Sequence, residues 1–191
     1  MMSKKLVKLN QEIILKLFDL SENNHDQILL AAKCIKKCFR IGGKVIIFGN
    51  GGSSAIASHV AVDLSKNARI RAVCFSDSSL ITCLSNDYNF NDWMAKALEI
   101  HCDNKKDLVI LVSSSGNSDN IINAGKYCKR NHVQLITLTG MSKKNKLKSL
   151  NKKNINFWVN SFAYNHIELT HLYILLTMVD VIIGKIVYKI Q

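Results

Sequence analysis

The chain has 191 residues, of which 48% are hydrophobic, and its formal net charge is +12 at pH 7. This length suits one compact domain, and the apolar content excludes a disordered chain. No apolar run follows the first lysines, so we expect no secretory signal and a cytoplasmic protein. In that compartment the six cysteines are expected to be reduced and buried, not joined in disulfides.

The first part of the chain predicts two helices. Apolar residues recur at helical spacing over residues 6–20 and again over residues 28–39. Together these segments predict an N-terminal helical hairpin. We expect a single domain over residues 1–191, in which helices occupy about 1–40 and an α/β core about 41–188.

Five short apolar runs predict the strands of a parallel sheet. Segments of helical length lie between most of them, and continuous apolar runs are typical of strands buried on both faces. Strands that alternate with helices predict a doubly wound α/β fold. We therefore expect a five-stranded, parallel, flavodoxin-like sheet with helices on both faces, its strands at residues 44–48, 71–75, 107–112, 133–138 and 155–159.

The last element, over residues 166–188, is long and apolar enough to span a membrane. However, Glu168, His171 and Asp180 fall inside it. A charged side chain in the middle of a bilayer costs about 3 kcal/mol. We therefore expect a helix buried in a bundle or a subunit interface, and no membrane anchor.

A glycine-rich loop, Gly49–Ser54, directly follows the first predicted strand. Its glycines allow the backbone to approach a ligand closely and to direct N–H groups at it. The loop lacks the Gly-Lys-Ser/Thr of a Walker loop and does not match the dinucleotide G-x-G-x-x-G pattern. We therefore expect no nucleotide cofactor.

A serine-rich loop follows the third predicted strand and leads into a helix. Its hydroxyls belong to Ser113, Ser114, Ser115 and Ser118, and Gly116 lies among them. Hydroxyls and free amides at a helix N-terminus favour an anion. An ordinary helix cap needs only one such residue. The loop is therefore interpreted as a cradle for a phosphate group.

These loops, with three shorter motifs, resemble the phosphoheptose isomerases, which convert sedoheptulose 7-phosphate and have the sugar isomerase (SIS) fold. The resemblance runs from about residue 6 to residue 188, and its strength lies in the order and spacing of the motifs. The motifs are Gly49-Asn50-Gly51-Gly52-Ser53, Ser76-Asp77, Asn86-Asp87, Ser113-Ser114-Ser115-Gly116-Asn117-Ser118 and Leu138-Thr139-Gly140.

The resemblance implies an activity and a set of binding residues. The implied reaction converts sedoheptulose 7-phosphate to a manno-heptose 7-phosphate through an enediol, in a homotetramer with sites between subunits. Asp87 resembles the family's substrate-positioning aspartate. The other implied substrate contacts are the four serines of the cradle for the phosphate, and Asn50, Gly51, Gly52 and Ser53 for the sugar.

An aldose–ketose isomerase needs an acid and a base. His59 and Asp63 are spaced i, i+4 on one predicted helix, and Glu168 and His171 are spaced i, i+3 on the last one. We predict that the four side chains form one cluster, with Asp63, Glu168 and His171 catalytic. Zn²⁺ is a candidate metal, with His59, Asp63 and Glu168 as its ligands. A buried hydrogen-bonded polar cluster is the alternative, above all for His171.

The resemblance is imperfect at the catalytic positions. The family carries a glutamate where this chain has Asp63, a glutamine at Glu168, an arginine at Asn67 and a catalytic histidine at Leu176. A second hypothesis is therefore a binding protein without turnover, which senses a sugar phosphate or binds a partner, as relatives associated with the replication initiator DnaA do. The complete phosphate cradle favours the enzyme, and Leu176 favours the binding protein.

A lysine-rich run over residues 143–153 supplies much of the positive charge. Such a run can attract nucleic acid, but no aromatic residues alternate with these lysines to stack on bases. We interpret it as a solvated loop and do not expect nucleic acid as a partner. A basic protein does suit an anionic substrate, and the expected partner is a phosphorylated sugar.

Overall fold

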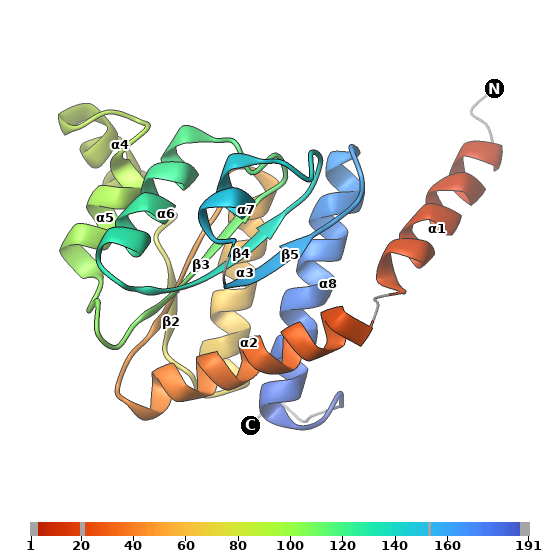
Figure 1. Ribbon diagram of the computed structural model, residues 1–191, viewed down its shortest axis with the longest axis horizontal. Coiled ribbons are helices and arrows are strands. Elements are labelled where there is room, and N and C mark those ends of the chain that lie inside the picture. The colour runs from red at the N-terminus through yellow and green to blue at the C-terminus, as the bar shows by residue number, and fades with distance from the viewer. Residues whose placement is uncertain (1–3, 20–21, 153, 188–191) are drawn as a thin grey trace.

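The computed structural model describes residues 4–19, 22–152 and 154–187, and its centre is a sheet of five parallel strands (Figure 1). The strand order is β2-β1-β3-β4-β5. This confirms the flavodoxin-like sheet, and each strand lies within two residues of its predicted bounds. The strands are β1 (Val45–Phe48), β2 (Ala72–Cys74), β3 (Leu108–Ser113), β4 (Gln134–Thr139) and β5 (Ile155–Trp158).

Helices cover the two faces of the sheet, as predicted. Residues of α2, α3 and α8 pack on one face, and residues of α4, α5, α6 and α7 pack on the other. The helices are α1 (Lys4–Phe18), α2 (Glu22–Arg40), α3 (Gly52–Lys66), α4 (Ser78–Asp87), α5 (Trp93–His101), α6 (Asp119–Arg130), α7 (Lys146–Leu150) and α8 (Tyr164–Ile183).

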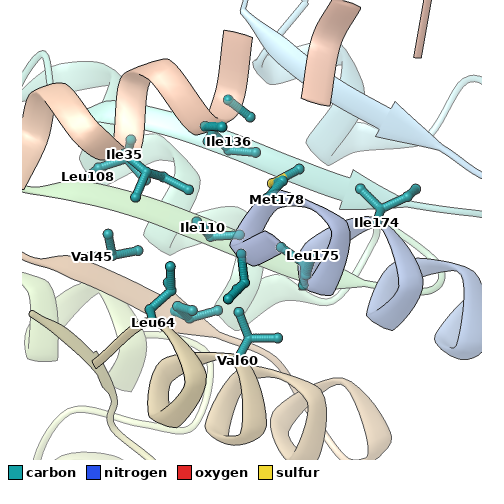
Figure 2. Packing of buried hydrophobic residues seen from close by; sticks show 14 of the residues in the cluster. Ile35, Val45, Val60, Leu64, Leu108, Ile110, Ile136, Ile174, Leu175 and Met178 are labelled. Atoms are coloured by element: carbon teal, nitrogen blue, oxygen red, sulfur yellow. The ribbon is translucent and has the colours of Figure 1, made fainter. Parts of the chain in front are cut away.

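Alternate side chains of the strands β1 to β4 supply two hydrophobic cores. In β1, Val45 and Ile47 point to the first core, whereas Ile46 and Phe48 point to the second, as the two-residue period of a strand requires. Figure 2 shows the first core, in which side chains from α2, α3 and α8 meet those of the strands. In the second core, the Phe48 and Trp93 rings meet edge to face with centroids 5.6 Å apart.

The chain changes face between the two central strands β1 and β3. The helix after β1 is α3, on the first face, and the helix after β3 is α6, on the second. The loops after these strands therefore lead to opposite faces of the sheet. In open α/β sheets, ligands bind at such a switch point, in the crevice outside the carboxyl ends of the strands. The glycine-rich and serine-rich loops are these two loops.

The last helix, α8, has the length and composition of a membrane span. Its residues Ile174, Leu175 and Met178 are buried in the first core, so α8 packs as a core helix, as expected (Figure 2). Residue 188, at the predicted end of this helix, lies outside the described residues, as do residue 20 and Lys153.

The two N-terminal helices are confirmed, and α1 packs along α8. The rings of Phe18 and Tyr173 stack with centroids 4.6 Å apart, and Asn10 is 2.9 Å from the His166 ring nitrogen. In Figure 1, α1 and α2 diverge from their connection at an open angle. Among its described residues α1 has no buried side chain. One side of this helix is therefore left open to solvent.

Candidate active site

The serine-rich loop turns sharply after β3, and its own side chains fix the turn. The Ser113 hydroxyl accepts a hydrogen bond from the Gly116 amide (3.1 Å), and the Ser115 hydroxyl accepts one from the Asn117 amide (3.2 Å). Ser113 is only 6% exposed. These bonds hold the loop in a fixed shape over the N-terminus of α6, where the helix dipole favours an anion.

The hydroxyls of Ser114 and Ser118 do not help to fix the shape of this loop. The Ser114 hydroxyl is buried and has no hydrogen-bond partner among the described residues. Ser118 precedes α6 at the N-cap position, yet its side chain makes no capping bond within the described part of the chain. An unmet buried hydroxyl costs about 1–3 kcal/mol. The Ser114 hydroxyl is therefore a donor that no group of the described chain uses.

The side chain of Asn145 packs against the serine-rich loop at Gly116. Gly116 has a φ of +63°, and a Cβ at this position would lie 2.2 Å from the Asn145 side-chain oxygen. The next two residues continue the contact: the Lys146 amide donates to the Asn117 side chain (3.0 Å) and the Leu147 amide to the Gly116 carbonyl (2.9 Å). The loop is thus clamped against the start of α7.

The glycine-rich loop has the close packing that its composition predicts. A Cβ on Gly49 would lie 2.4 Å from the backbone of Ser53, and Gly51 has a φ of +53°. The Ser53 amide donates to the Asn50 carbonyl (3.0 Å), and Ser53 itself is 3% exposed. A side chain at Gly49 would not fit, and one at Gly51 would be strained. The loop therefore presents backbone groups at the crevice.

Asn50 and Asn120 join the two loops. Each side-chain amide donates to the other's oxygen, at 2.9 Å and 3.0 Å, and the Asn120 oxygen also accepts from the Ile121 amide (2.9 Å). This bridge holds the loop after β1 against the first turn of α6. Sequence reasoning missed Asn120 and Asn145, because single asparagines carry no signal in an asparagine-rich chain.

Glu168 lies against the glycine-rich loop. A Cβ on Gly52 would be 2.5 Å from a Glu168 carboxylate oxygen, so this carboxylate covers the backbone at the first residue of α3. A carboxylate is favoured at the N-terminus of a helix. The sequence placed Glu168 among the catalytic residues, and the structure brings it beside the loop expected to contact the sugar.

His59 and Asp63 form an ion pair on α3. The His59 ring nitrogen lies 3.2 Å from an Asp63 carboxylate oxygen, and the Asn67 amide donates to the other oxygen (3.0 Å). The charge of Asp63 also reaches α8: burial and then this charge raise the pKa of Asp180. The His59 side chain is 56% exposed and the Asp63 side chain 21%. The pair is accessible from solvent.

His171 does not join them, and the expected four-residue cluster is not formed. Its side chain is fully buried, and its Nε2 donates to the Thr139 carbonyl (3.1 Å). Burial lowers the pKa of His171 to about 4. The buried, neutral ring of His171 is closed off from ligands in this structure, which does not support its assignment to catalysis. It is a core residue that holds the end of β4.

Asp87, expected to contact the substrate, is not held by either loop. It ends α4 on the surface, and its hydrogen bonds within the described chain are with Cys83 and Asn86.

The zinc hypothesis lacks a set of donor atoms. No three His, Cys, Asp or Glu side chains form a metal site in residues 4–19, 22–152 and 154–187. The pair His59 and Asp63 forms without Glu168.

Comparison with known proteins identifies the family of the chain. The SIS domain family model matches residues 10–140, which include both loops and the bridge between them. The phosphoheptose isomerase of Sodalis glossinidius is 35% identical over 169 residues, covering 82% of this chain and 85% of that protein. The chain belongs to the phosphoheptose isomerase family of SIS domain proteins. A further relative, from Cytophaga hutchinsonii, is 36% identical over 132 residues, covering 66% of this chain and 69% of that protein.

Solved structures of this family share the whole fold. Phosphoheptose isomerase from Neisseria gonorrhoeae superposes with a TM-score of 0.85 at 26% identity, covering 94% of this chain and 98% of its own. The enzyme from Francisella tularensis gives a TM-score of 0.84 at 27% identity, covering 97% and 100%. The N-terminal helices and α8 therefore belong to the family architecture and are not additions to it.

Proposed function

We propose that the protein isomerises a sugar phosphate, namely sedoheptulose 7-phosphate to a manno-heptose 7-phosphate. The observation that carries the proposal is the buried Ser114 hydroxyl, which has no partner in the described chain and belongs to a rigid loop at the N-terminus of α6. Relatives named phosphoheptose isomerases, at about 35% identity over most of the chain, support this substrate.

The substrate's phosphate is held by the serine-rich loop. Ser114 and Ser118 donate their uncommitted hydroxyls, and Ser113 and Ser115, whose oxygens already accept backbone bonds, donate their hydroxyl protons outward. A phosphate dianion accepts all of these bonds without a lysine. The sugar extends toward the glycine-rich loop, where it contacts Asn50, Gly51, Gly52 and Ser53.

The proton transfers are assigned to Glu168 as the base and to His59, oriented by Asp63, as the proton donor. Isomerisation moves a proton between neighbouring carbons through an enediolate, so it needs a carboxylate base and a proton donor near the loop that binds the sugar. The Glu168 carboxylate covers Gly52, and Asp63 orients the exposed ring of His59 at 3.2 Å. His59 is exposed and can therefore donate a proton, whereas His171 is buried. Zinc has no role in these transfers, because His59, Asp63 and Glu168 do not form one metal site.

A binding protein without turnover is the less favoured function. Leu176 occupies the position of the family's catalytic histidine, and it cannot transfer a proton. However, this chain has two carboxylates, Asp63 and Glu168, and the exposed His59, and its similar relatives bear the names of enzymes.

The active assembly is proposed to be a homotetramer with sites at subunit interfaces. Several large apolar side chains of the N-terminal helices are exposed in the single chain, and a second copy would cover them. Asp87, which neither loop holds, is then supplied to the site of a neighbouring subunit. The exposed apolar residues are Leu6, Val7, Leu9 and Leu15 on α1 and Leu29, Leu30 and Phe39 on α2.

The remaining expectations complete the proposal. All six cysteines are free, which fits the reducing cytoplasm. The two cores share one sheet, which supports a single SIS domain over residues 1–191, with helices in about 1–40 and the α/β core in about 41–188. The proposed partner is a phosphorylated sugar, without a membrane or nucleic acid.

Calorimetry with sedoheptulose 7-phosphate and with unphosphorylated sedoheptulose tests the cradle. We expect the phosphate to dominate binding, and Ser115→Ala to lose about 1–2 kcal/mol of affinity, the worth of a hydrogen bond to a charged group. Ser142→Ala is the matched control, because this exposed serine follows a different strand. Equal affinity for the two sugars would refute the cradle.

A further inference from the structure

A second cavity lies at the opposite, amino-terminal edge of the sheet. Its volume is about 540 Å³, within the range of small-molecule sites. The end of α6, the start of β4 and the end of α7 form its walls. Residues that line it and matter for its chemistry are Lys129, His132, Gln134, Ser149, Asn151 and Lys152.

The cavity lies in a part of the chain that has no acidic residue. Residues 120–167 contain no Asp and no Glu, and every residue that lines the cavity belongs to this stretch. The stretch supplies most of the net charge of +12. Its basic residues are Lys126, Lys129, Arg130, Lys143, Lys144, Lys146, Lys148, Lys152 and Lys153.

The basic side chains at the cavity are not neutralised by the protein. Among the described residues neither Lys129 nor Lys152 forms an ion pair. A neighbouring pocket that shares His132 and Gln134 is lined by one acidic residue, Asp107, whose carboxylate is held by the Lys44 ammonium at 2.5 Å. The field in the cavity is therefore positive, and such a field concentrates anions.

The ends of α6 and α7 do not cancel this charge. Each helix C-terminus contributes roughly half a negative charge, which Lys129 and Arg130 in the last turn of α6 already offset. Burial and then the charge of Lys143 lower the pKa of Lys148, which shows that positive charge is in excess along α7. The balance at the cavity is cationic.

The geometry points to a second ligand site: we propose that this cavity binds a small organic anion with two phosphate groups, such as a sugar bisphosphate. The two lysines come from different elements, Lys129 from α6 and Lys152 from the segment after α7, and suit two phosphates, whereas the Gln134 amide and the Ser149 hydroxyl suit sugar hydroxyls. This site goes beyond the proposed isomerase activity and does not depend on it.

One short helix connects the two sites. The first residues of α7, Lys146 and Leu147, donate backbone bonds to the serine-rich loop, whereas Ser149 and Leu150 at its other end line the cavity. A ligand that shifts α7 would therefore also change the position of the serine-rich loop.

Calorimetric titration with fructose 1,6-bisphosphate tests the site. We expect the wild-type protein and Ser115→Ala to bind it alike, and the double variant Lys129→Gln/Lys152→Gln to bind it at least about tenfold more weakly. The matched control is Lys126→Gln/Lys144→Gln, which removes the same charge from the same stretch outside the cavity lining. This control should retain most of the affinity.

Three results would overturn the proposal. Equal losses in the two double variants would mean a diffuse field and no site. A loss in Ser115→Ala alone would place the bisphosphate in the serine-rich loop. Absence of binding to the wild-type protein at millimolar ligand would also exclude the site. The substituted lysines are exposed, so thermal unfolding should confirm that all variants fold.

Discussion

Asn50 and Asn120 exchange two hydrogen bonds across the crevice between the loops after β1 and β3. The partners are 70 residues apart in the chain. The pair fixes the distance between the loop that would hold the phosphate and the loop that would hold the sugar. A ligand that contacts both loops must therefore match this separation.

Breaking the bridge should cost stability and affinity together. Asn120→Ala leaves the Asn50 amide and the Ile121 amide without their acceptor, so we expect a loss of about 1–3 kcal/mol in the free energy of unfolding. Sugar-phosphate affinity should fall as well. Asn123→Ala is the control, because Asn123 lies on the same helix as Asn120. Its hydrogen bond goes to Asp92, away from the loops. A double cycle with Asn50→Ala that shows no coupling would contradict the bridge.

Removing the Ser114 hydroxyl should separate stability from binding. Because this buried hydroxyl has no partner in the described chain, Ser114→Ala is expected to leave the free energy of unfolding unchanged or up to about 1 kcal/mol higher. Affinity for a sugar phosphate should nevertheless fall about tenfold. Ser113→Ala removes a hydroxyl bonded to Gly116 and should instead destabilise the protein. Urea unfolding and calorimetry on the same variants distinguish the two effects.

Gly116 should tolerate no side chain. Gly116→Ala adds left-handed strain of about 1–2 kcal/mol and a clash with the Asn145 side chain. Gly42 has a φ of +80° with no atom near its Cβ position, so Gly42→Ala isolates the strain. We expect the Gly116 variant to be clearly less stable than the Gly42 variant and to lose sugar-phosphate binding. Equal unfolding midpoints would mean that Asn145 does not clamp the loop.

His171 should make the protein sensitive to acid. Burial lowers the pKa of His171 to about 4. An unfolded histidine titrates near about 6.5, so below that pH the unfolded chain binds a proton that the folded chain cannot take up. Stability should therefore fall as the pH drops from about 6.5 toward 4, by up to about 3 kcal/mol in total. His171→Gln, which keeps a donor for the Thr139 carbonyl, should flatten this part of the profile. An unchanged slope would exclude His171 as the cause.

Most of the fold followed from the sequence, because its signals are local. The five apolar runs predicted the five strands, and the glycine-rich and serine-rich segments predicted the loops at the carboxyl edge. The pairing of His59 with Asp63 also followed from their spacing on one helix.

The errors concern contacts between elements. Glu168 and His171 share a helix and lie one turn apart, yet one covers Gly52 and the other is buried under Thr139. Sequence spacing gives the face of a helix but not how deeply each side chain is buried. The Asn50–Asn120 bridge and the Asn145 clamp depend on the packing of α3, α6 and α7, and no pattern in the sequence marks them.

Turnover of sedoheptulose 7-phosphate, followed by NMR, tests the central claim most directly. The wild-type protein is expected to form the aldose, and Asp63→Asn and Glu168→Gln should each lower kcat by about a hundredfold or more, the usual worth of a positioned acid or base. Lys66→Gln, an exposed change on the same helix as Asp63, should leave kcat unchanged. If the wild-type protein binds the sugar phosphate but forms no aldose, or if the combined Asp63→Asn/Glu168→Gln variant turns over at the wild-type rate, the isomerase mechanism is contradicted.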